Sequence, residues 1–386
     1  MHYSHDNLID LRRQLHAGAE PSNQEARTAE TIRVFLSLHH PERLVSGVGG
    51  HGLFAVWGKP DQGGTVLVRA ELDAVPIADS PELPWRSSTE GTAHKCGHDG
   101  HMAMVAGLAP LLDANPPVTG AVALLFQPAE ETGEGAARML ADARMQALGP
   151  RYAVAIHNLP GFEAGAVVVK DGVFAAASTG VVISLAGSTS HAGEPDNGRN
   201  PASAMVELMQ TLAALADEDA DLADFARMTI VHARLGRPDA FGTTPGEAVV
   251  AATLRSFDAA AVDALLKRVE SAACALAARH GLELDVRTTE RFPALHNDEH
   301  VTAAFRAGAR DAGLRVVELE RPFRWSEDFA HIAAACPAAL IGLGAGLAQP
   351  PLHDGRYDFP DALVHSGCRL LWSVTNRLLE LAQVTS

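Results

Sequence analysis

Short apolar stretches that are typical of strands alternate with stretches that are typical of helices along most of this chain. Gly52–Trp57 and Thr65–Arg69 have strand character, whereas Gln24–Leu38 and Val364–Ala382 have helical character. Chains that alternate in this way form a largely parallel sheet with helices packed on both of its faces. The sequence therefore predicts an α/β fold with three layers.

The order of elements changes between about Gly180 and Arg291. The expected elements are a strand, a helix, two strands, a helix and a strand, at Val181–Leu185, after Asn200-Pro201, at Met228–Leu235, at Ala248–Phe257, after Asp258 and at Leu282–Val286. This order, β-α-β-β-α-β, is that of ferredoxin-like domains. We therefore expect residues 179–291 to form an inserted α+β domain, and residues 1–178 and 292–386 to form the larger domain.

Composition limits the classes of partner and compartment. The chain has 386 residues, of which 47% are hydrophobic, so it can bury a large core and form more than one domain. A net charge of −16 argues against binding to nucleic acid or to an anionic membrane. No signal peptide or membrane-spanning run is evident. The four cysteines show no paired spacing, and we therefore expect a cytoplasmic protein.

Several residues that could bind a metal ion lie together in Cys96-Gly97-His98-Asp99-Gly100-His101. Thiolate and imidazole groups are good ligands for divalent metals, and one intervening glycine lets Cys96 and His98 reach a common point. The apolar segment that follows predicts a helix, which places the cluster at a loop-to-helix junction. The alternative is that Cys96 is a small core residue and that the histidines are polar residues at a helix start.

Two adjacent carboxylates, Glu130 and Glu131, follow the strand-like run Ala121–Phe126. Neighbouring side chains on an extended segment point in opposite directions, so one carboxylate could bind a cation while the other faces a water molecule. A metal-dependent hydrolase needs such a division between metal ligand and general base. The alternative is a solvated acidic loop.

Two further histidines follow apolar runs. His157 comes after Tyr152–Ile156, and His353 comes some residues after Ala338–Leu343. Ligand sites of open α/β sheets gather at the carboxyl ends of the strands, so these residues and the two clusters are expected at one edge of the sheet. A single histidine at a strand end is usually structural, but core packing does not predict the whole set.

Seven segments of the chain together carry a family resemblance. They are Leu11–His16, Arg69–Pro76, Cys96–His101, Gln127–Glu131, His157-Asn158, Ser326–Phe329 and Pro351–Phe359. In this combination and order they resemble the aminoacylase, hippurate-hydrolase and auxin-conjugate-hydrolase branch of metallopeptidase family twenty, to which carboxypeptidase G is more distantly related. The resemblance covers nearly the whole chain.

The resemblance implies a dinuclear centre with two divalent ions per subunit, Zn²⁺, Mn²⁺ or Co²⁺. The implied ligands are Cys96, His98, Glu131, His157 and His353, and their division between the two ions stays open. Glu130 would be the general base for a metal-activated water, and Asp73 would orient a ligand imidazole. Asp73 could instead be a turn acid before Pro76. Distant relatives have a ligand histidine where this chain has Glu71, which is therefore expected to be structural, with metal ligation as the alternative.

The resemblance also assigns roles to the inserted domain, as a lid and as a dimerisation domain of a homodimer or higher homo-oligomer. His191 would polarise the substrate carbonyl, in some family members across a dimer interface, or it could be a solvent-facing loop residue. Its loop departs from the common His-Ala-Ala-x-Pro-His form, which affects the expected substrate preference. Arg199 and Arg255 are candidates for binding a substrate carboxylate, although surface arginines are common.

The expected activity is hydrolysis of the amide bond of N-acyl amino acids or related amide conjugates. A dinuclear metallo-dipeptidase on the same scaffold is the first alternative. A nucleotide-dependent oxidoreductase is the second, because Gly342-Leu-Gly-Ala-Gly346 resembles part of a dinucleotide fingerprint, although its glycine spacing is incomplete. A non-catalytic binding protein would be expected to lack one of the ligands or the base.

Overall fold

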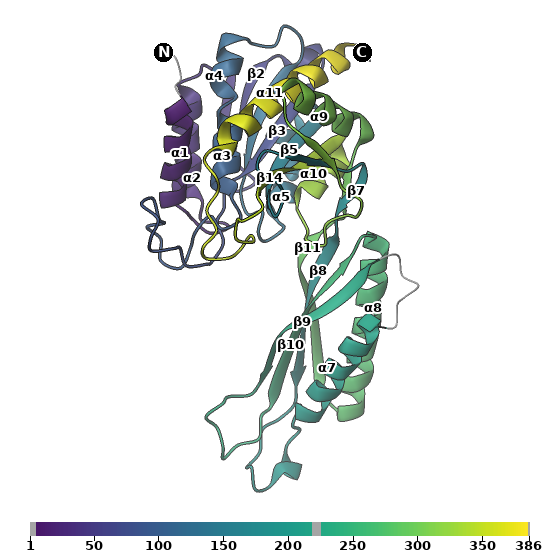
Figure 1. Ribbon diagram of the computed structural model, residues 1–386. Coiled ribbons are helices and arrows are strands. Elements are labelled where there is room, and N and C mark those ends of the chain that lie inside the picture. Colours follow the sequence, from purple (N-terminus) through teal and green to yellow (C-terminus); the bar gives the residue numbers. More distant parts are fainter. Residues whose placement is uncertain (1–4, 218–224, 385–386) are drawn as a thin grey trace. The chain divides into compact units, whose positions relative to one another are not determined.

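The computed structural model describes residues 5–217 and 225–384, and these divide into two compact units (Figure 1). Unit 1 consists of the chain up to Phe174 together with Leu295–Arg321 and the chain from Asp328 onward. Unit 2 consists of Ala175–Ala294 and Pro322–Glu327. Among the described residues, no helix is both long and apolar enough to cross a lipid bilayer.

Unit 1 is built around an eight-stranded sheet in the order β1-β2-β4-β3-β5-β14-β6-β13. The strands are β1 (Arg43–Val48), β2 (Gly52–Gly58), β3 (Thr65–Glu71), β4 (Ala121–Gln127), β5 (Pro150–Pro160), β6 (Val167–Val169), β13 (Val316–Glu318) and β14 (Ala338–Gly346). The four central strands, β4, β3, β5 and β14, are parallel neighbours. Their carboxyl ends therefore share one edge of the sheet.

The expectation of a largely parallel sheet is wrong at the flanks. β1 pairs with β2, β2 with β4, and β14 with β6 in antiparallel fashion. For β1 and β2 the reason is the short connection through Gly49 and Gly50, whose positive φ angles of 64° and 124° form a tight turn. Only antiparallel strands can be joined by so short a connection. The sheet is therefore mixed, with a parallel centre.

Helices cover both faces of this sheet. On one face, α1 (His5–Ala17), α2 (Ala26–Ser37), α3 (His98–Ala106), α9 (Glu299–Asp311) and α11 (Leu363–Val384) share a core with alternate residues of the central strands. The opposite face is covered by α5 (Gly135–Ala141) and α10 (Phe329–Ala335). Three shorter helices complete the unit: α4 (Ala109–Ala114), α6 (Ala143–Gln146) and the 3₁₀ helix η1 (Pro60–Gln62). The predicted three-layer α/β fold is confirmed.

Burial on both faces explains why the central strands have continuous apolar sequences. Every residue of β3 and β4 is buried, including Arg69 and Glu71. Alternate residues of β4, such as Val122 and Leu124, face the core that contains α3 and α11, and the residues between them face the other layer. Strands enclosed by two helical layers show no polar alternation.

Unit 2 has a four-stranded antiparallel sheet in the order β11-β8-β10-β9. Its elements are β8 (Ala177–Ala186), the 3₁₀ helix η2 (Pro195–Asn197), α7 (Ala202–Asp217), β9 (Ala226–Leu235), β10 (Glu247–Ser256), α8 (Ala259–His280) and β11 (Glu283–Phe292). Both long helices contribute to a single core against the sheet, through residues such as Leu208 and Val269. The predicted ferredoxin-like order of elements is confirmed. β7 (Gly172–Ala175) and β12 (Leu295–Asn297) pair with each other and form a separate two-stranded sheet.

Local signals in the sequence set several helix ends. The Asp258 side chain accepts a hydrogen bond from the Ala260 N–H at the start of α8, and Gly281 ends that helix with a φ of 64°. At the start of α9, Asp298 accepts hydrogen bonds from the N–H groups of His300 and Val301, at 2.9 and 3.1 Å. These contacts satisfy backbone donors that would otherwise lack a partner within the helix.

Replacing Asp298 with alanine is expected to lower the free energy of unfolding by about 1 kcal/mol, because the start of α9 loses its cap. Denaturant unfolding followed by circular dichroism would measure the change. Glu299→Ala, one residue further along and outside the cap contacts, is the matched control and is expected to change stability much less. Equal effects of the two substitutions would contradict the capping role of Asp298.

Candidate metal centre and active site

The central strands bring the predicted site residues of unit 1 to one edge of the sheet. Asp73 follows β3, the two glutamates follow β4, and His353 lies in the loop after β14. His157 is within β5, so the prediction that it stands at a strand end is wrong. β5 continues to Pro160 because it stays paired with β14 over this length.

The segment with Cys96 and His98 turns sharply at Gly97, which has a φ of 94°. A Cβ atom at this position would lie 2.3 Å from Oδ1 of Asn158, so only glycine fits. α3 begins directly afterwards, at His98, and both Cys96 and His98 are buried. The prediction that this cluster lies at a loop-to-helix junction is therefore confirmed.

Cys96, His98 and His157 form a fully buried group in which the candidate ligand atoms lie within 4.8 Å of one another. The Sγ atom of Cys96 is 3.5 Å from Nε2 of His157. Nδ1 of His98 donates to the Asp73 carbonyl at 2.8 Å, and Nδ1 of His157 donates to the Asn158 carbonyl at 2.9 Å. These hydrogen bonds direct Nε2 of each ring into the group, as in metal sites with oriented histidine ligands.

A second group, formed by Cys96, Glu131 and His353, meets the same 4.8 Å criterion and is more open. Oε2 of Glu131 is 3.7 Å from Nε2 of His353, whose side chain is 50% exposed. Oε1 of Glu131 is 3.7 Å from Nε2 of His98. The five predicted ligands therefore lie together, and Cys96 belongs to both groups.

Glu130 is buried next to these groups, with Oε2 3.8 Å from Nε2 of His98. The two glutamates lie in a turn and not on an extended segment, so the expected opposite directions of their side chains are wrong: both carboxylates approach His98. The turn begins at Ala129, which has a positive φ of 49° and donates its N–H to Oε1 of Glu25 at 2.8 Å. The positions of the two carboxylates therefore result from this turn and not from the alternation of side chains along a strand.

Asp73 is fully buried and lies close to both Glu131 and His98. Its Oδ2 accepts hydrogen bonds from Ser22 Oγ at 2.7 Å and from the Glu131 N–H at 3.0 Å, and its Oδ1 is 3.7 Å from Nδ1 of His98. Burial would raise the pKa of Asp73, but His98, Ser22 and the Glu131 N–H lower it overall. Asp73 is therefore an ionised residue that is hydrogen-bonded to the Glu131 backbone and lies close to the His98 ring.

The two innermost histidines differ in their electrostatic environment. Burial would lower the pKa of His98, but Asp73, Glu71 and Glu131 together raise it to about 10. Burial and the neighbouring His101 lower the pKa of His157 to about 3. The site as a whole therefore attracts positive charge, either as a proton on His98 or as a metal ion in its place.

A buried network of charged and polar side chains lies next to the candidate ligands. Glu71 pairs with Arg69 and accepts from Nδ1 of His101 at 2.7 Å, and Arg69 also pairs with Asp328 at 2.8 Å. Burial would raise the pKa of Glu71, but Arg69 and His101 lower it well below its usual value. Glu71 therefore has partners that fit its expected structural role. No local feature of the sequence indicated this network, because Arg69 and Asp328 lie 259 positions apart in the chain.

The motif Gly342–Gly346 lies within β14 and does not form a strand-to-helix turn. A Cβ atom at Gly342 would lie 2.0 Å from Cδ1 of Leu159, and one at Gly344 would lie 2.0 Å from the Glu163 carbonyl oxygen. These glycines therefore allow close packing of neighbouring segments. The structure offers no support for the dinucleotide-binding alternative at this motif.

Comparison with known proteins decides the family. Residues 67–375 match the model of peptidase family M20/M25/M40. The chain belongs to this family.

Curated M20 relatives include two proteins of Bacillus subtilis (strain 168). One, named N-acetyl-L-cysteine deacetylase, is 29% identical over 97% of this chain and 88% of its own length. The other, named N-acetylcysteine deacetylase, is 30% identical over 88% of each chain. Among solved structures, the YXEP protein of Bacillus subtilis, described as a dinuclear metal binding peptidase from the M20 family, superimposes with a TM-score of 0.79. It is 26% identical, with 97% of this chain and 98% of that chain covered. The predicted family resemblance is confirmed.

The residues at the sheet edge fit divalent metal ions of the kind that an M20 centre implies. A thiol, three imidazoles and a carboxylate converge there. Nε2 of His98 is buried and has no hydrogen-bond partner in the described part of the chain, which is costly unless a proton or an ion occupies its lone pair. Such mixed sulfur, nitrogen and oxygen donors suit borderline metals such as zinc.

The predicted site residues His191, Arg199 and Arg255 belong to unit 2. The backbone of Arg199 forms a β-bridge with Ser188, just beyond the end of β8. Arg255 on β10 lies opposite Ser178, near the start of β8. Ten residues of extended chain separate the two positions, roughly 33 Å. Arg199 and Arg255 of one chain therefore cannot bind the same carboxylate together. Arg255 is half-buried and donates to Ser326 Oγ at 3.0 Å, and burial lowers its pKa.

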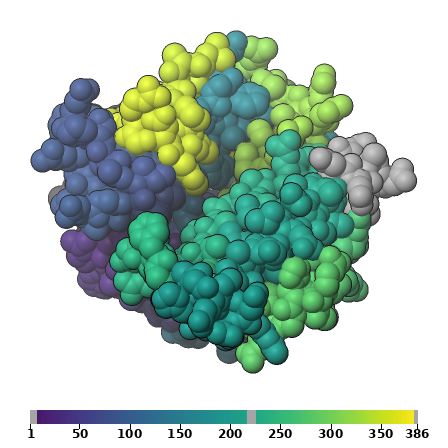
Figure 2. Space-filling model, turned by 90° about the horizontal axis from the view of Figure 1, so that it is seen from below, coloured from purple at the N-terminus to yellow at the C-terminus, as the bar shows by residue number. Residues whose placement is uncertain are grey.

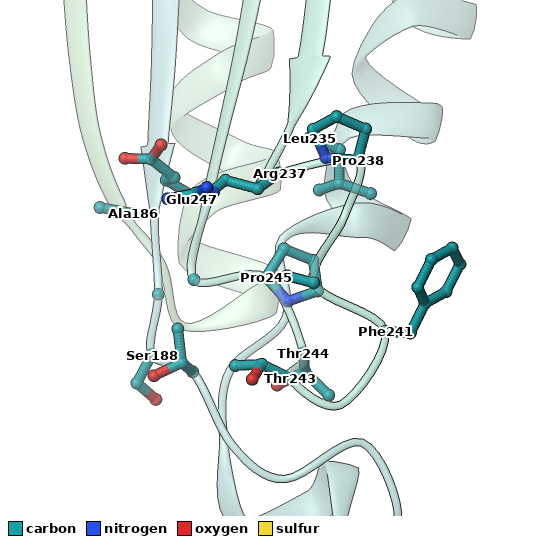
Figure 3. Close-up of a pocket in the computed structure, with 15 residues that line it drawn as sticks. Ala186, Ser188, Leu235, Arg237, Pro238, Phe241, Thr243, Thr244, Pro245 and Glu247 are labelled. Atoms are coloured by element: carbon teal, nitrogen blue, oxygen red, sulfur yellow. The ribbon is translucent and has the colours of Figure 1, made fainter.

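His191 lies at the Arg199 end of unit 2, on the loop after β8. It is exposed, forms a backbone bridge to Thr243, and its Nδ1 accepts from the Gly193 N–H at 3.0 Å. A pocket of about 820 Å³ opens beside this loop, between the start of the loop and the β9–β10 connection, as Figure 3 shows. Figure 2 looks onto this end of unit 2, where Phe241 is 90% exposed.

Metal affinity is expected to rise with pH, by at least about tenfold per pH unit between roughly pH 6 and pH 9. The physical reason is that His98 holds a proton below its raised pKa of about 10, and a metal ion must displace that proton. Competition titrations with a chelator of known pH dependence would measure the slope. An affinity that stays constant over this range would contradict the environment described for His98.

Proposed function

We propose that this M20 protein is a metal-dependent amidohydrolase that cleaves the amide bond of N-acyl amino acids. The single observation that carries the proposal is the pair of overlapping ligand groups that share Cys96, with Glu130 buried beside both. The names of the two Bacillus relatives, which are deacetylases of acetylated cysteine, support an acyl amino acid as substrate. We expect the substrate to be small and its acyl group to be short.

The overlapping groups suggest how the ligands divide. His98 and His157 would hold one ion and Glu131 and His353 the other, and Cys96 lies within reach of both sets. Thiolate and imidazole favour Zn²⁺, and the carboxylate also suits Mn²⁺ or Co²⁺. Two divalent ions, when bound, supply Lewis acidity at the substrate carbonyl and make a water molecule acidic enough to lose a proton near neutral pH.

Glu130 would act as the general base. It is one of two adjacent carboxylates, and Glu131 is the one that also approaches His353. Glu130 is thus left to accept the proton of the attacking water and to return it to the leaving amine. Asp73 would hold the Glu131 backbone and the His98 ring in place through the contacts described above.

His191 would donate to the substrate carbonyl oxygen as negative charge develops on it. The hydrogen bond from the Gly193 N–H to Nδ1 supports this role, because a neutral ring with an acceptor at Nδ1 carries its hydrogen on Nε2. Nε2 is then a donor. Arg199 and Arg255 stay separate candidates for a substrate carboxylate.

The Glu130→Gln variant is expected to lose about 100- to 10,000-fold in kcat while it keeps its bound metal, because only the proton acceptor is removed. Hydrolysis of N-acetyl and N-benzoyl amino acids, with elemental analysis of the protein, would measure both quantities. Glu134→Gln, an exposed glutamate in the same segment, is the matched control. Full turnover by Glu130→Gln would show that another group is the base.

The same substrate panel separates the proposal from the dipeptidase alternative. An amidohydrolase of acyl amino acids is expected to cleave the acylated substrates and to leave unmodified dipeptides intact, and a chelator should abolish the activity. Cleavage of Ala-Ala-type dipeptides without cleavage of acylated amino acids would instead favour the dipeptidase.

We also propose that the chain forms a homodimer through the β9 edge of unit 2, and that it works in the cytoplasm. Among the described strands, β9 is paired on one side only. Val231 and Leu235 on this strand are exposed apolar residues, at 61% and 39%. The opposite edge strand, β11, has no exposed large apolar side chain among the described residues and carries more charged residues than β9, such as Glu283, Asp285 and Arg287. Charged side chains discourage edge pairing. The lack of any disulfide in the described residues is consistent with a reducing compartment.

Val231→Lys is expected to convert the dimer to a monomer, because two copies would place charges opposite each other across the paired edge. Light scattering coupled to size-exclusion chromatography would measure the mass. Thr288→Lys introduces the same charge on β11 and is expected to leave the dimer intact. A monomeric wild type, or a dimer that survives Val231→Lys, would contradict an interface at β9.

A further inference from the structure

A chain of alternating charges lies buried behind the candidate metal centre. Nε of Arg12 is 2.8 Å from Oδ2 of Asp99, and Nδ1 of His16 is 2.8 Å from the same oxygen. Nε2 of His16 is 3.1 Å from Oδ2 of Asp79, and Oδ1 of Asp79 pairs with Nζ of Lys95. The side chains of Arg12, His16, Lys95 and Asp99 have no solvent exposure.

The charges within this chain alternate in sign. Both ring nitrogens of His16 face carboxylate oxygens, so both act as donors and the ring is an imidazolium. Burial would lower the pKa of His16, but Asp99 and Asp79 raise it to about 9. Cations that belong to the protein thus neutralise the carboxylates, and no metal ion is needed there.

This ion chain is connected to both candidate metal groups. Asp99 follows His98 directly in α3, and Lys95 directly precedes Cys96. The carbonyl oxygen of Lys95 accepts the His353 N–H at 2.9 Å. Nζ of Lys95 also donates to the Tyr357 carbonyl at 2.8 Å.

Two further contacts tie the His353 loop to the rest of unit 1. Arg12 on α1 pairs with Asp358 of this loop, and Nδ2 of Asn158 donates to Tyr357 Oη at 2.7 Å. The loop therefore has tethers from α1, from β5 and from the segment before α3, which carry residues of the ion chain or of the metal groups.

The His353 loop has no regular structure of its own to define its position. No helix or strand lies between the end of β14 at Gly346 and the start of α11 at Leu363. His353 itself has a φ of 64°, a conformation that non-glycine residues rarely adopt without surrounding contacts. The place of its imidazole therefore depends on the tethers, together with the burial of Phe359 of the same loop in the core of unit 1.

We propose that Arg12, His16, Asp79, Lys95 and Asp99 form a positioning clamp, which holds the His353 loop against α3 and so completes the outer metal group. This inference rests on the proposed function only in that the two groups bind metal ions. None of the clamp residues contacts substrate in this account. They act through His353, so their loss is expected to weaken one ion selectively.

The test uses Co²⁺ titration of the metal-free full-length protein, because thiolate-to-cobalt absorption reports coordination by Cys96 independently of activity. Lys95→Met removes the charge that holds the Tyr357 carbonyl. Asp358→Asn weakens the Arg12 tether at a residue outside the two candidate metal groups. In each variant, the second equivalent of Co²⁺ is expected to bind at least tenfold more weakly than in the wild type. The first equivalent should bind within about threefold of its wild-type affinity.

Arg356→Met is the matched control. Arg356 lies in the same loop, is 77% exposed and pairs with Asp354 outside the clamp, so its loss should change neither equivalent. If Lys95→Met does not fold, Asp358→Asn carries the test. Unchanged binding of both equivalents, or an equal loss at both, would overturn the clamp, because an equal loss indicates general destabilisation.

The outcome also separates this inference from the proposed function. A wild type that binds two Co²⁺ ions but hydrolyses no acyl amino acid overturns the proposed activity and leaves the clamp to be judged by the variants. A wild type that binds no Co²⁺ overturns both. If the wild type is active and the variants bind both equivalents of Co²⁺ with wild-type affinity, the clamp alone is overturned.

Discussion

The candidate site of unit 1 depends on the convergence of donor groups at one buried edge of the sheet, where its four central strands are parallel. Buried carboxylates and imidazoles without compensating charge are costly, because the low-dielectric interior does not solvate them. Asp73, Glu130 and Glu131 contribute three carboxylates close to His98. The raised pKa of His98 shows how strongly this edge favours a cation. Folding of the edge and binding of a cation are therefore linked processes.

Much of this arrangement could be predicted because its determinants are local in sequence. The apolar runs of β3 and β4 predicted strands, and Asp258 predicted the start of α8. The spacing of Cys96 and His98 around a glycine predicted a shared ligand group. In each of these cases the physical cause lies within a few residues, so sequence reasoning was sufficient for these elements and for the proximity of Cys96 to His98.

Other features could not be predicted because their causes lie far apart in the chain. Arg12 meets Asp358 across 346 positions, and Arg69 meets Asp328 across 259. Nothing local to these residues distinguishes a buried partner from a solvated one. The antiparallel flanks of the sheet and the continuation of β5 beyond His157 depend likewise on which strands become neighbours. The turn at Ala129 depends on a positive φ that few residues other than glycine adopt, and the sequence has no glycine there.

The two units differ in how much their functional residues are constrained. In unit 1, the candidate ligands and base are buried among groups that each depend on the others, so a change at one position disturbs several contacts. In unit 2, the side chains of His191 and Arg199 are exposed on a loop, where substitutions usually carry little cost in stability. Chemistry is thus expected to follow unit 1, and substrate preference to follow the loop of unit 2.

The buried ion chain is better explained by the placement of the His353 loop than by a gain in the free energy of unfolding. Buried ion pairs gain little net free energy, because desolvation offsets most of their mutual attraction. A hydrophobic core at Arg12, His16 and Lys95 could be equally stable, but it would not distinguish one placement of the neighbouring loop from another. Directional pairing does so, since each carboxylate accepts from particular donors at particular angles. A loop that must deliver one imidazole to a metal group has a physical need for that specificity, and this need explains why so many charges are buried beside residues that already form a charged site.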